Sequence, residues 1–419
     1  MKILHINTRD YGGAAVAAIR LHQALLDQGV DSSMLFLEQK NIGIPGFYSV
    51  QDTKKKQLNY FIRKIISVWN RIIRMKTRSA ENEKKIAGRN VNSGMFSLDP
   101  SDYDLSENIL CKEADVIHLH WCSRFFDFKS FQSLRKPIVW TLHDMNPFTG
   151  GCHFSNACYK FESECRNCPQ LAGAKDPDIA WMDQKYKKKY LEDVSLIPVA
   201  PSYWMKSCSE RSALFGSFRN YCIPNSVNTD VFKPLNKAFC REVLNWPVNK
   251  TILLFVSEEV NNPRKGFDLL VEAHALINIP DMLICVIGIT GITAKVIPGI
   301  NYQGKINDEK LMAVAYSAVD ALVIPSREDN LPNTMLESLA CGTPVIAFKT
   351  GGIPEVITNG VNGILSEDLT SMSLAESISW FYENSGLFSE NEIRNDAVKR
   401  FSPQGQAYYY TKLYKDLLN

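Results

Sequence analysis

Carboxylates, a helix start and a glycine pair gather in one stretch late in the chain. Residues 324–356 read IPSREDNLPNTMLESLACGTPVIAFKTGGIPEV, and their acids include Asp329 and Glu337. A carboxylate on the first turns of a helix can accept hydrogen bonds from two adjacent hydroxyls, and one in the preceding loop can accept others. Backbone N–H groups at the helix start attract an anion. The stretch therefore predicts a site for a ligand that carries both hydroxyls and phosphate.

The elements that position these groups follow from the same residues. An apolar strand ends at Ile324, and a helix begins near Pro332 and stops at Gly342. A second strand over 344–348 leads into a Gly-Gly turn. Together, these elements predict a pocket at the ends of the two strands, lined by the acidic loop, the helix start and the glycine turn. Taken alone, the acid pair is more often a surface acid followed by a helix with an exposed Glu, but the whole frame favours a site. The residues that we expect to bind the ligand here are Glu328, Asn330, Leu331, Pro332, Asn333 and Glu337.

Two adjacent cations, Arg264 and Lys265, precede a predicted helix that starts at Phe267. They fall on the same side of the predicted sheet as Glu337, because both groups follow strands. When a sugar–phosphate bond breaks, negative charge grows on the departing phosphate, and fixed cations stabilise it. Loss of one such contact typically raises the barrier by ~3–4 kcal/mol. Without further context, two solvated loop charges are an equally good interpretation.

Length and composition set the class of protein. A chain of 419 residues is long enough for two α/β domains, and 47 basic against 45 acidic residues give no field that favours nucleic acid. We find no signal-peptide core and no 18-residue apolar run. Eleven cysteines, an odd number, argue against a secreted disulfide scaffold. We therefore expect a cytoplasmic protein.

The chain divides into two α/β series. A strand over 3–6, a Gly-Gly turn and a helix over 14–28 open the first series, and apolar strands over 116–120 and 138–142 continue it. The second series begins at the strand over 251–256. We predict a first domain over 1–222, a hinge over 223–234, a second domain over 235–402 and a C-terminal helix over 403–419.

These motifs resemble those of the family 4 retaining glycosyltransferases. Asp329 and Glu337 have the family's separation of seven residues, CGTPV covers 341–345, and a Gly-Gly-x-x-Glu turn ends at Glu355. The lead-in WTLHDMNPFTGGC and the exit CPQL are similar to a subset that includes colanic-acid and O-antigen transferases. The resemblance implies the GT-B fold, in which two Rossmann-like α/β domains face each other across a deep interdomain cleft. It also implies that the C-terminal helix crosses back to the first domain.

The resemblance assigns roles to individual residues. It implies that the backbone at Gly13 approaches the donor diphosphate and that His143 lies against the donor hexose. Lys265-Gly266 matches the family, whereas Ser257-Glu258 stands where Gly-Arg is usual, so Arg264 is the expected substitute. Either Glu328 or Asp329 contacts the donor sugar. The leaving phosphate is thought to take the acceptor proton, so catalysis is mostly positioning and electrostatics by Arg264, Lys265, His143 and Asp329.

Two further features concern metals. Asp102/Asp104 and Asp176/Asp178 are Asp-x-Asp pairs in turn-like sequence, and we interpret them as turn formers. We expect neither a catalytic metal nor a cofactor. Four cysteines lie within 17 residues, and we consider either a structural zinc site or, equally, reduced thiols or a labile disulfide. These are Cys152, Cys158, Cys165 and Cys168.

The segment 54–78 has nine Lys or Arg residues and no acid, with apolar residues on one helical face. Such a helix either lies on an anionic membrane surface or packs on the first domain. The family's acceptors are often polyprenyl-linked, which favours a peripheral location on the inner face of the cytoplasmic membrane.

The combined prediction is a retaining, metal-independent hexosyltransferase. It would move a hexose from a nucleoside-diphosphate sugar to a polyprenyl-diphosphate-linked oligosaccharide in bacterial surface polysaccharide biosynthesis, such as that of lipopolysaccharide, exopolysaccharide, O-antigen or colanic acid. Two alternatives remain open. One is a nucleotide-sugar epimerase of the same fold, which would isomerise the donor without an acceptor. The other is a non-catalytic metal-binding protein built around the four cysteines.

Overall fold

The computed structural model divides the chain into two compact units. It describes residues 1–419 except 42, 52–77, 88, 90–93, 172–175 and 292–296. Unit 1 comprises Met1–Ile223 and Ala407–Asn419, and unit 2 comprises Pro224–Gln406. The boundaries predicted from the sequence were 1–222 with 403–419, and 235–402, with a hinge over 223–234 between them.

Unit 1 is built on a parallel sheet of seven strands in the order β3-β2-β1-β4-β5-β6-β7. The strands are β1 (Lys2–Arg9), β2 (Asp31–Glu38), β3 (Phe47–Ser49), β4 (Val116–Leu119), β5 (Ile138–Thr141), β6 (Leu196–Ala200) and β7 (Tyr221–Cys222). Every residue of β4 and β5 is buried, as their continuous apolar sequence predicts for strands covered on both faces. The order changes direction between β1 and β4, so the loops after these strands diverge there.

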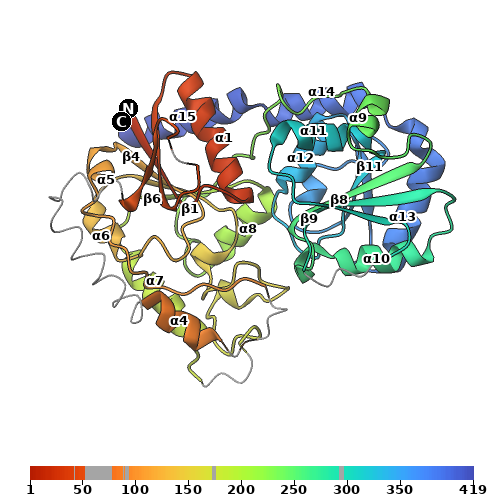
Figure 1. The fold of residues 1–419 in the computed structure, drawn as a ribbon. Helices are drawn as coiled ribbons and strands as arrows, with labels where there is room; N and C mark the ends of the chain where they lie inside the picture. The colour runs from red at the N-terminus through yellow and green to blue at the C-terminus, as the bar shows by residue number, and fades with distance from the viewer. Residues whose placement is uncertain (42, 52–77, 88, 90–93, 172–175, 292–296) are drawn as a thin grey trace, which may run out of the picture. The chain divides into compact units, whose positions relative to one another are not determined.

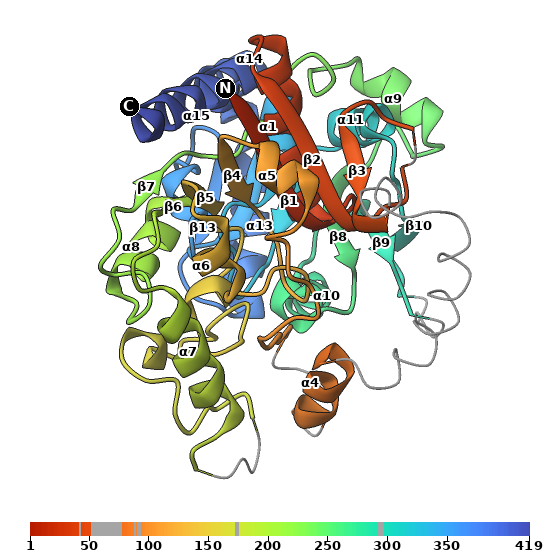
Figure 2. The ribbon, with the colours of Figure 1, turned by 90° about the vertical axis from the view of Figure 1, so that its left-hand side faces the viewer.

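Helices cover both faces of the unit 1 sheet. The helices of unit 1 are α1 (Gly13–Asp27), α4 (Arg78–Ile86), α5 (Ile109–Glu113), α6 (Ser130–Leu134), α7 (Ile179–Tyr190), α8 (Tyr203–Arg211) and α15 (Pro403–Leu418), with 3-10 turns η3 (Asn146–Phe148) and η4 (Lys160–Glu162). Side chains of α1 and α15 pack on one face, against Ile3, Val116 and Val139. Figure 2 shows α6, α7 and α8 on the opposite side of the strands from α15.

Unit 2 repeats this plan with a six-stranded parallel sheet in the order β10-β9-β8-β11-β12-β13. Its strands are β8 (Thr251–Glu259), β9 (Met282–Ile289), β10 (Ile300–Gly304), β11 (Ala321–Ile324), β12 (Val345–Phe348) and β13 (Gly363–Ser366). The direction changes between β8 and β11, so the loops that follow these strands diverge there, as they do between β1 and β4. The predicted α/β class with two Rossmann-like halves is confirmed.

The helices of unit 2 also divide between the two faces (Figure 1). They are α9 (Lys237–Val243), α10 (Phe267–Leu276), α11 (Glu309–Ala318), α12 (Asn333–Ala340), α13 (Ser371–Asn384) and α14 (Glu390–Phe401), with 3-10 turns η5 (Pro263–Lys265), η6 (Ile353–Glu355) and η7 (Ser385–Leu387). Alternate residues of β8 enter the two cores: Ile252 packs on the α11 and α12 side, whereas Leu253 packs on the α10 and α13 side.

Two sequence predictions need separate notes. The basic segment predicted over 54–78 lies outside the described residues, apart from Arg78 at the start of α4. In the described part of the chain, no helix is long and apolar enough to cross a membrane.

Candidate functional site

The acidic loop between β11 and α12, residues 325–332, is clamped by two glycine turns. Gly266 has a φ of 69°, and a Cβ at this position would collide with the carbonyl oxygen of Pro325. Gly351 has a φ of 56°, and a Cβ there would collide with the carbonyl oxygen of Asp329. Both positions thus need glycine for conformation and for space. The Lys-Gly and Gly-Gly motifs of the sequence therefore fix the acidic loop from two sides.

Asp329 is the electrostatic centre of this loop. Its carboxylate accepts a hydrogen bond from the Lys265 ammonium at 2.5 Å and lies 3.4 Å from Nη1 of Arg264. The hydroxyl of Ser326 and the backbone N–H of Asn330 also donate hydrogen bonds to the Asp329 carboxylate, at 3.3 and 3.1 Å. Burial by itself would raise the pKa of Asp329, but the attraction of Lys265 and Arg264 is stronger and lowers the pKa to about 2. Asp329 is therefore a buried anion at neutral pH.

The two cations are held rather than solvated. Burial lowers the pKa of Lys265, the neighbouring Arg264 charge lowers it further, and the Asp329 carboxylate partly offsets both. Nη1 of Arg264 also donates to the carbonyl oxygen of Glu328 at 2.7 Å, and the backbone N–H of Arg327 donates to the Arg264 carbonyl at 2.8 Å. The side chains of Arg264 and Lys265 remain 17% and 23% exposed, so an anion in solvent can reach both.

The helix after the acidic loop begins where the sequence predicts. Pro332 is the N-cap of α12 and Asn333 is its first residue. Glu337 lies on this helix with 8% of its surface exposed, and it accepts a hydrogen bond from the Tyr316 hydroxyl at 2.9 Å. A buried carboxylate at this position is oriented by its neighbours, which is what a hydroxyl-binding group requires.

The structure thus brings most of the predicted residues into one part of unit 2. Arg264, Lys265, Glu328 and Asp329 are joined by hydrogen bonds or ion pairs, and residues 330–333 connect them to α12. One local prediction was wrong. We expected the strand to end at Val256, but β8 continues to Glu259, because Glu259 still pairs with Ile289 of β9 after a shift in register.

Gly13 and His143 belong to unit 1. Gly13 is the first residue of α1, and a Cβ added to it would meet no described atom within 4 Å. The strained glycine of this turn is Gly12, with a φ of 89°. A side chain at this position would therefore meet no described atom, and the approach of the donor diphosphate to Gly13 stays a prediction.

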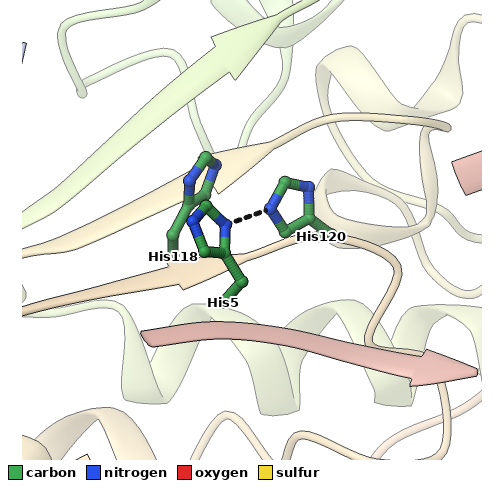
Figure 3. A group of neighbouring side chains, drawn as sticks. All are labelled: His5, His118 and His120. Atoms are coloured by element: carbon green, nitrogen blue, oxygen red, sulfur yellow. Dashed lines mark hydrogen bonds between the residues drawn. The ribbon is translucent and has the colours of Figure 1, made fainter. Parts of the chain in front are cut away.

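His143 is hydrogen-bonded to a buried histidine that sequence reasoning missed. Its Nε2 lies 3.1 Å from Nδ1 of His120, and Nε2 of His120 lies 2.9 Å from Nδ1 of His5 (Figure 3). Burial lowers the pKa of His143 to about 4, against a small opposing effect of Asp144. The available signal was the pattern His118-x-His120, which spans the end of β4, because residues two apart on a strand share a face.

Asp144 has a structural role beside His143. Its carboxylate accepts hydrogen bonds from Nε1 of Trp121 at 2.8 Å and from the backbone N–H of Asn146 at 3.0 Å. The carboxylate also lies 2.6 Å from Nδ1 of His153. Burial would raise the pKa of Asp144, but the charge and hydrogen bond of His153, with the backbone N–H of Asn146, outweigh burial and lower the pKa. The carboxylate anchors the turn that follows β5 and so fixes the backbone next to His143.

The four clustered cysteines line one pocket, together with Phe96, Phe161 and Lys160. All are free thiols, and burial raises the pKa of Cys165 to about 12. Among the described residues, His5, His118 and His120 have ligand atoms that lie within 4.8 Å of one another, close enough to hold a metal ion. The described cysteines form no group of three that is this close. A structural zinc site on the cysteines stays a prediction, as do reduced thiols and a labile disulfide.

Known proteins give an independent view of this fold and site. Residues 236–400 match the family described as glycosyl transferases group 1. The D-inositol 3-phosphate glycosyltransferase of Streptosporangium roseum is 32% identical over 176 residues, and this match spans 37% of the chain but only 40% of that enzyme's length. The putative colanic acid biosynthesis glycosyl transferase WcaC of Escherichia coli K12 is 24% identical over 382 residues, or 88% of each chain.

A solved structure extends the likeness to both units. The Anabaena protein HepE in complex with UDP-glucose matches all of this chain and of its own with a TM-score of 0.63, at 16% identity. The class is thus an α/β protein of the GT-B type, with two Rossmann-like halves. More specifically, residues 236–400 are similar to the glycosyl transferases group 1 family, and the whole Asp329 site lies within the matched region.

The glycine clamp makes a testable prediction about stability. Gly351→Ala should destabilise the protein by about 3 kcal/mol or more, because the new Cβ displaces the Asp329 carbonyl as well as straining a positive φ. Gly360→Ala is a matched control, since Gly360 also has a positive φ, 74°, but faces no described atom within 4 Å. Denaturant unfolding of both variants should show the Gly360 change costing only about 1 kcal/mol. Equal losses would show that the contact with Asp329 is unimportant.

The buried histidines predict acid sensitivity. Burial lowers the pKa of His22 to about 4, and burial first and neighbouring histidines second lower the pKa of His5 and His120 well below the usual 6.5. Below pH 6.5 the unfolded chain therefore binds protons that the folded chain does not. The free energy of unfolding should fall as pH drops from 6.5 toward 4, by up to about 1.4 kcal/mol per pH unit for each such histidine.

Denaturant midpoints measured at pH 7.5, 6.5 and 5.5 test this prediction. His22→Gln should reduce the pH dependence by about one proton. His274→Gln in unit 2 is the matched control, because His274 lies outside this group of buried histidines. A flat stability curve over this range would contradict the prediction.

Proposed function

We propose that the protein is a retaining, metal-independent hexosyltransferase of glycosyltransferase family 4 that uses a nucleoside-diphosphate sugar as its donor. The observation that carries this proposal is the pair of cations, Arg264 and Lys265, which Asp329 holds at the strand ends of unit 2. Both pair with Asp329, which lies four residues before α12 begins at Asn333, and backbone N–H groups at a helix start add positive potential. This arrangement suits the diphosphate of the donor. The charge that develops on the departing diphosphate would be stabilised by the same two cations.

The remaining groups suit the rest of such a donor. Glu337 is a buried, oriented carboxylate on α12, and we assign it to two adjacent hydroxyls of the ribose. Asp329 is already bonded to Lys265, Arg264 and Ser326, so we assign the sugar contact to Glu328. Asp329 then acts through the cations that it positions. His143 is proposed to contact the donor hexose, as the resemblance implies.

Relatives suggest the kind of acceptor. WcaC is described as a colanic acid biosynthesis transferase and matches 88% of this chain. We propose that this protein extends a polyprenyl-diphosphate-linked oligosaccharide in bacterial surface polysaccharide biosynthesis. HepE was solved with UDP-glucose, which makes UDP-sugars the first donors to test.

Replacement of Lys265 and replacement of Glu337 should affect different steps, the first the turnover rate and the second the affinity for the donor. Lys265→Met should lower kcat by about 100-fold or more, because it removes charge that acts mainly in the transition state. Glu337→Gln should chiefly weaken donor binding, by roughly 10-fold, because it removes a charged acceptor from the ribose. Donor affinities and sugar-transfer rates of the purified variants are the measurements.

Lys237→Met is a matched control for the lysine change. Lys237 also pairs with an aspartate of unit 2, Asp320 at 3.0 Å, but outside the proposed site. Normal kinetics in both Lys265→Met and Glu337→Gln would exclude this site. Donor isomerisation without any acceptor would instead identify an epimerase.

We also propose that the basic segment 54–78 binds anionic membranes. Its nine cations and lack of acids support the proposal, because each Lys or Arg near an anionic surface contributes about 1 kcal/mol. Replacement of Lys54, Lys55 and Lys56 by Glu should reduce co-flotation with liposomes that contain anionic lipid. Neutral liposomes are the control, and unchanged flotation would reject electrostatic binding.

A further inference from the structure

Three histidine rings form a continuous hydrogen-bonded chain in unit 1. His5 comes from β1, His120 follows β4, and His143 follows β5. Nδ1 of His5 lies 2.9 Å from Nε2 of His120, and Nδ1 of His120 lies 3.1 Å from Nε2 of His143. His5 and His120 are 0% and 3% exposed, whereas His143 is partly exposed. The chain therefore runs from the core of the sheet to the residue that we expect at the ligand.

The two contacts have only two consistent proton arrangements. Each N···N contact needs one N–H and one lone pair, and a neutral ring has one of each. The N–H groups therefore all point outward, from His5 toward His143, or all point inward. Lowered pKa values keep His5, His120 and His143 neutral at pH 7. The direction chosen by one ring fixes the other two.

His5 decides between the two directions. Its Nε2 is buried and has no hydrogen-bond partner among the described residues. With inward-pointing donors this atom would be an N–H without an acceptor, which is rare in protein interiors. With outward-pointing donors it is only an unused lone pair. Outward donation is therefore favoured, and it leaves the proton of His143 on Nδ1.

A metal ion is a poorer explanation of the same histidines. The ligand atoms of His5, His118 and His120 lie within 4.8 Å of one another (Figure 3). However, the rings of His118 and His120 are stacked, with centroids 4.2 Å apart and planes at 30°, so their lone pairs run side by side. Both nitrogens of His118 are also engaged, by Tyr414 at 2.6 Å and Thr141 at 2.7 Å.

We propose that His5 and His120 are positioning residues that hold His143 as the neutral Nδ1–H tautomer, so that His143 meets its ligand as a hydrogen-bond donor. A ligand atom that contacts this Nδ1 would then be an acceptor, such as the oxygen of a sugar hydroxyl. This last part rests on the proposed function. The tautomer itself is a property of unit 1 and needs no ligand.

Long-range ¹H–¹⁵N NMR of the histidine rings tests the tautomer directly. In the ligand-free protein, Nδ1 of His143 should have the chemical shift of a protonated nitrogen and Nε2 that of an unprotonated one. His5→Leu removes the first donor and should convert His143 into a mixture of tautomers. His5→Asn should preserve the tautomer, because the side-chain amide can donate from nearly the position of Nδ1. His22→Asn is the control, since His22 is buried nearby but bonds to Ser32.

The possible outcomes separate this proposal from the proposed function. Protonation of Nε2 in the wild type, or an unchanged His143 in His5→Leu, would overturn the histidine chain. Displacement of the ring signals by added Zn²⁺ would favour the metal site instead and would also overturn it. If UDP-sugars bind, His5→Leu should weaken them roughly 3- to 10-fold and His5→Asn by less. A wild type that has the predicted tautomer but binds no nucleotide sugar would refute the proposed donor alone.

Discussion

The ion pair between Asp329 and the two cations is the constraint on which the rest of the unit 2 site depends. An isolated carboxylate at this depth would be neutralised by burial, and an isolated Lys265 would lose its proton more easily. Each group therefore keeps its charge because the other is present. The same contact joins the loop after β8 to the loop after β11, which are otherwise separate in the sequence. This one contact therefore sets both the charge and the geometry of the site where the strand order changes direction, between β8 and β11.

Glycine makes this constraint possible. The acidic loop can approach its neighbours closely only because Gly266 and Gly351 have no side chains. The surrounding strands supply rigidity, since every residue of β11 and β12 is buried. A charged group in such surroundings has few alternative positions, which suits electrostatic stabilisation of a transition state.

Much of this arrangement was accessible from the sequence because it depends on local patterns. Buried parallel strands appear as continuous apolar runs, and Pro332 and Gly342 mark the ends of α12 within a residue or two. The position of Arg264 and Lys265 on the same side of the sheet as Glu337 followed from the rule that loops after parallel strands meet at one edge. The role of Asp329 did not follow, because spacing does not tell whether a carboxylate faces a ligand or a neighbouring cation. The partnership of Glu337 with Tyr316, and that of His143 with His120 and His5, also depend on side-chain directions that no motif encodes.

The C-terminal helix has a consequence for how the protein is made. α15 begins in unit 2 and continues into unit 1, where Tyr410 and Tyr414 are fully buried beside His118. The strands of unit 1 leave the ribosome before unit 2, yet part of their core is synthesised only after unit 2. Unit 1 must therefore wait, incompletely packed, while all of unit 2 is translated. The order of synthesis and the order of completion are thus reversed for the two halves of this chain.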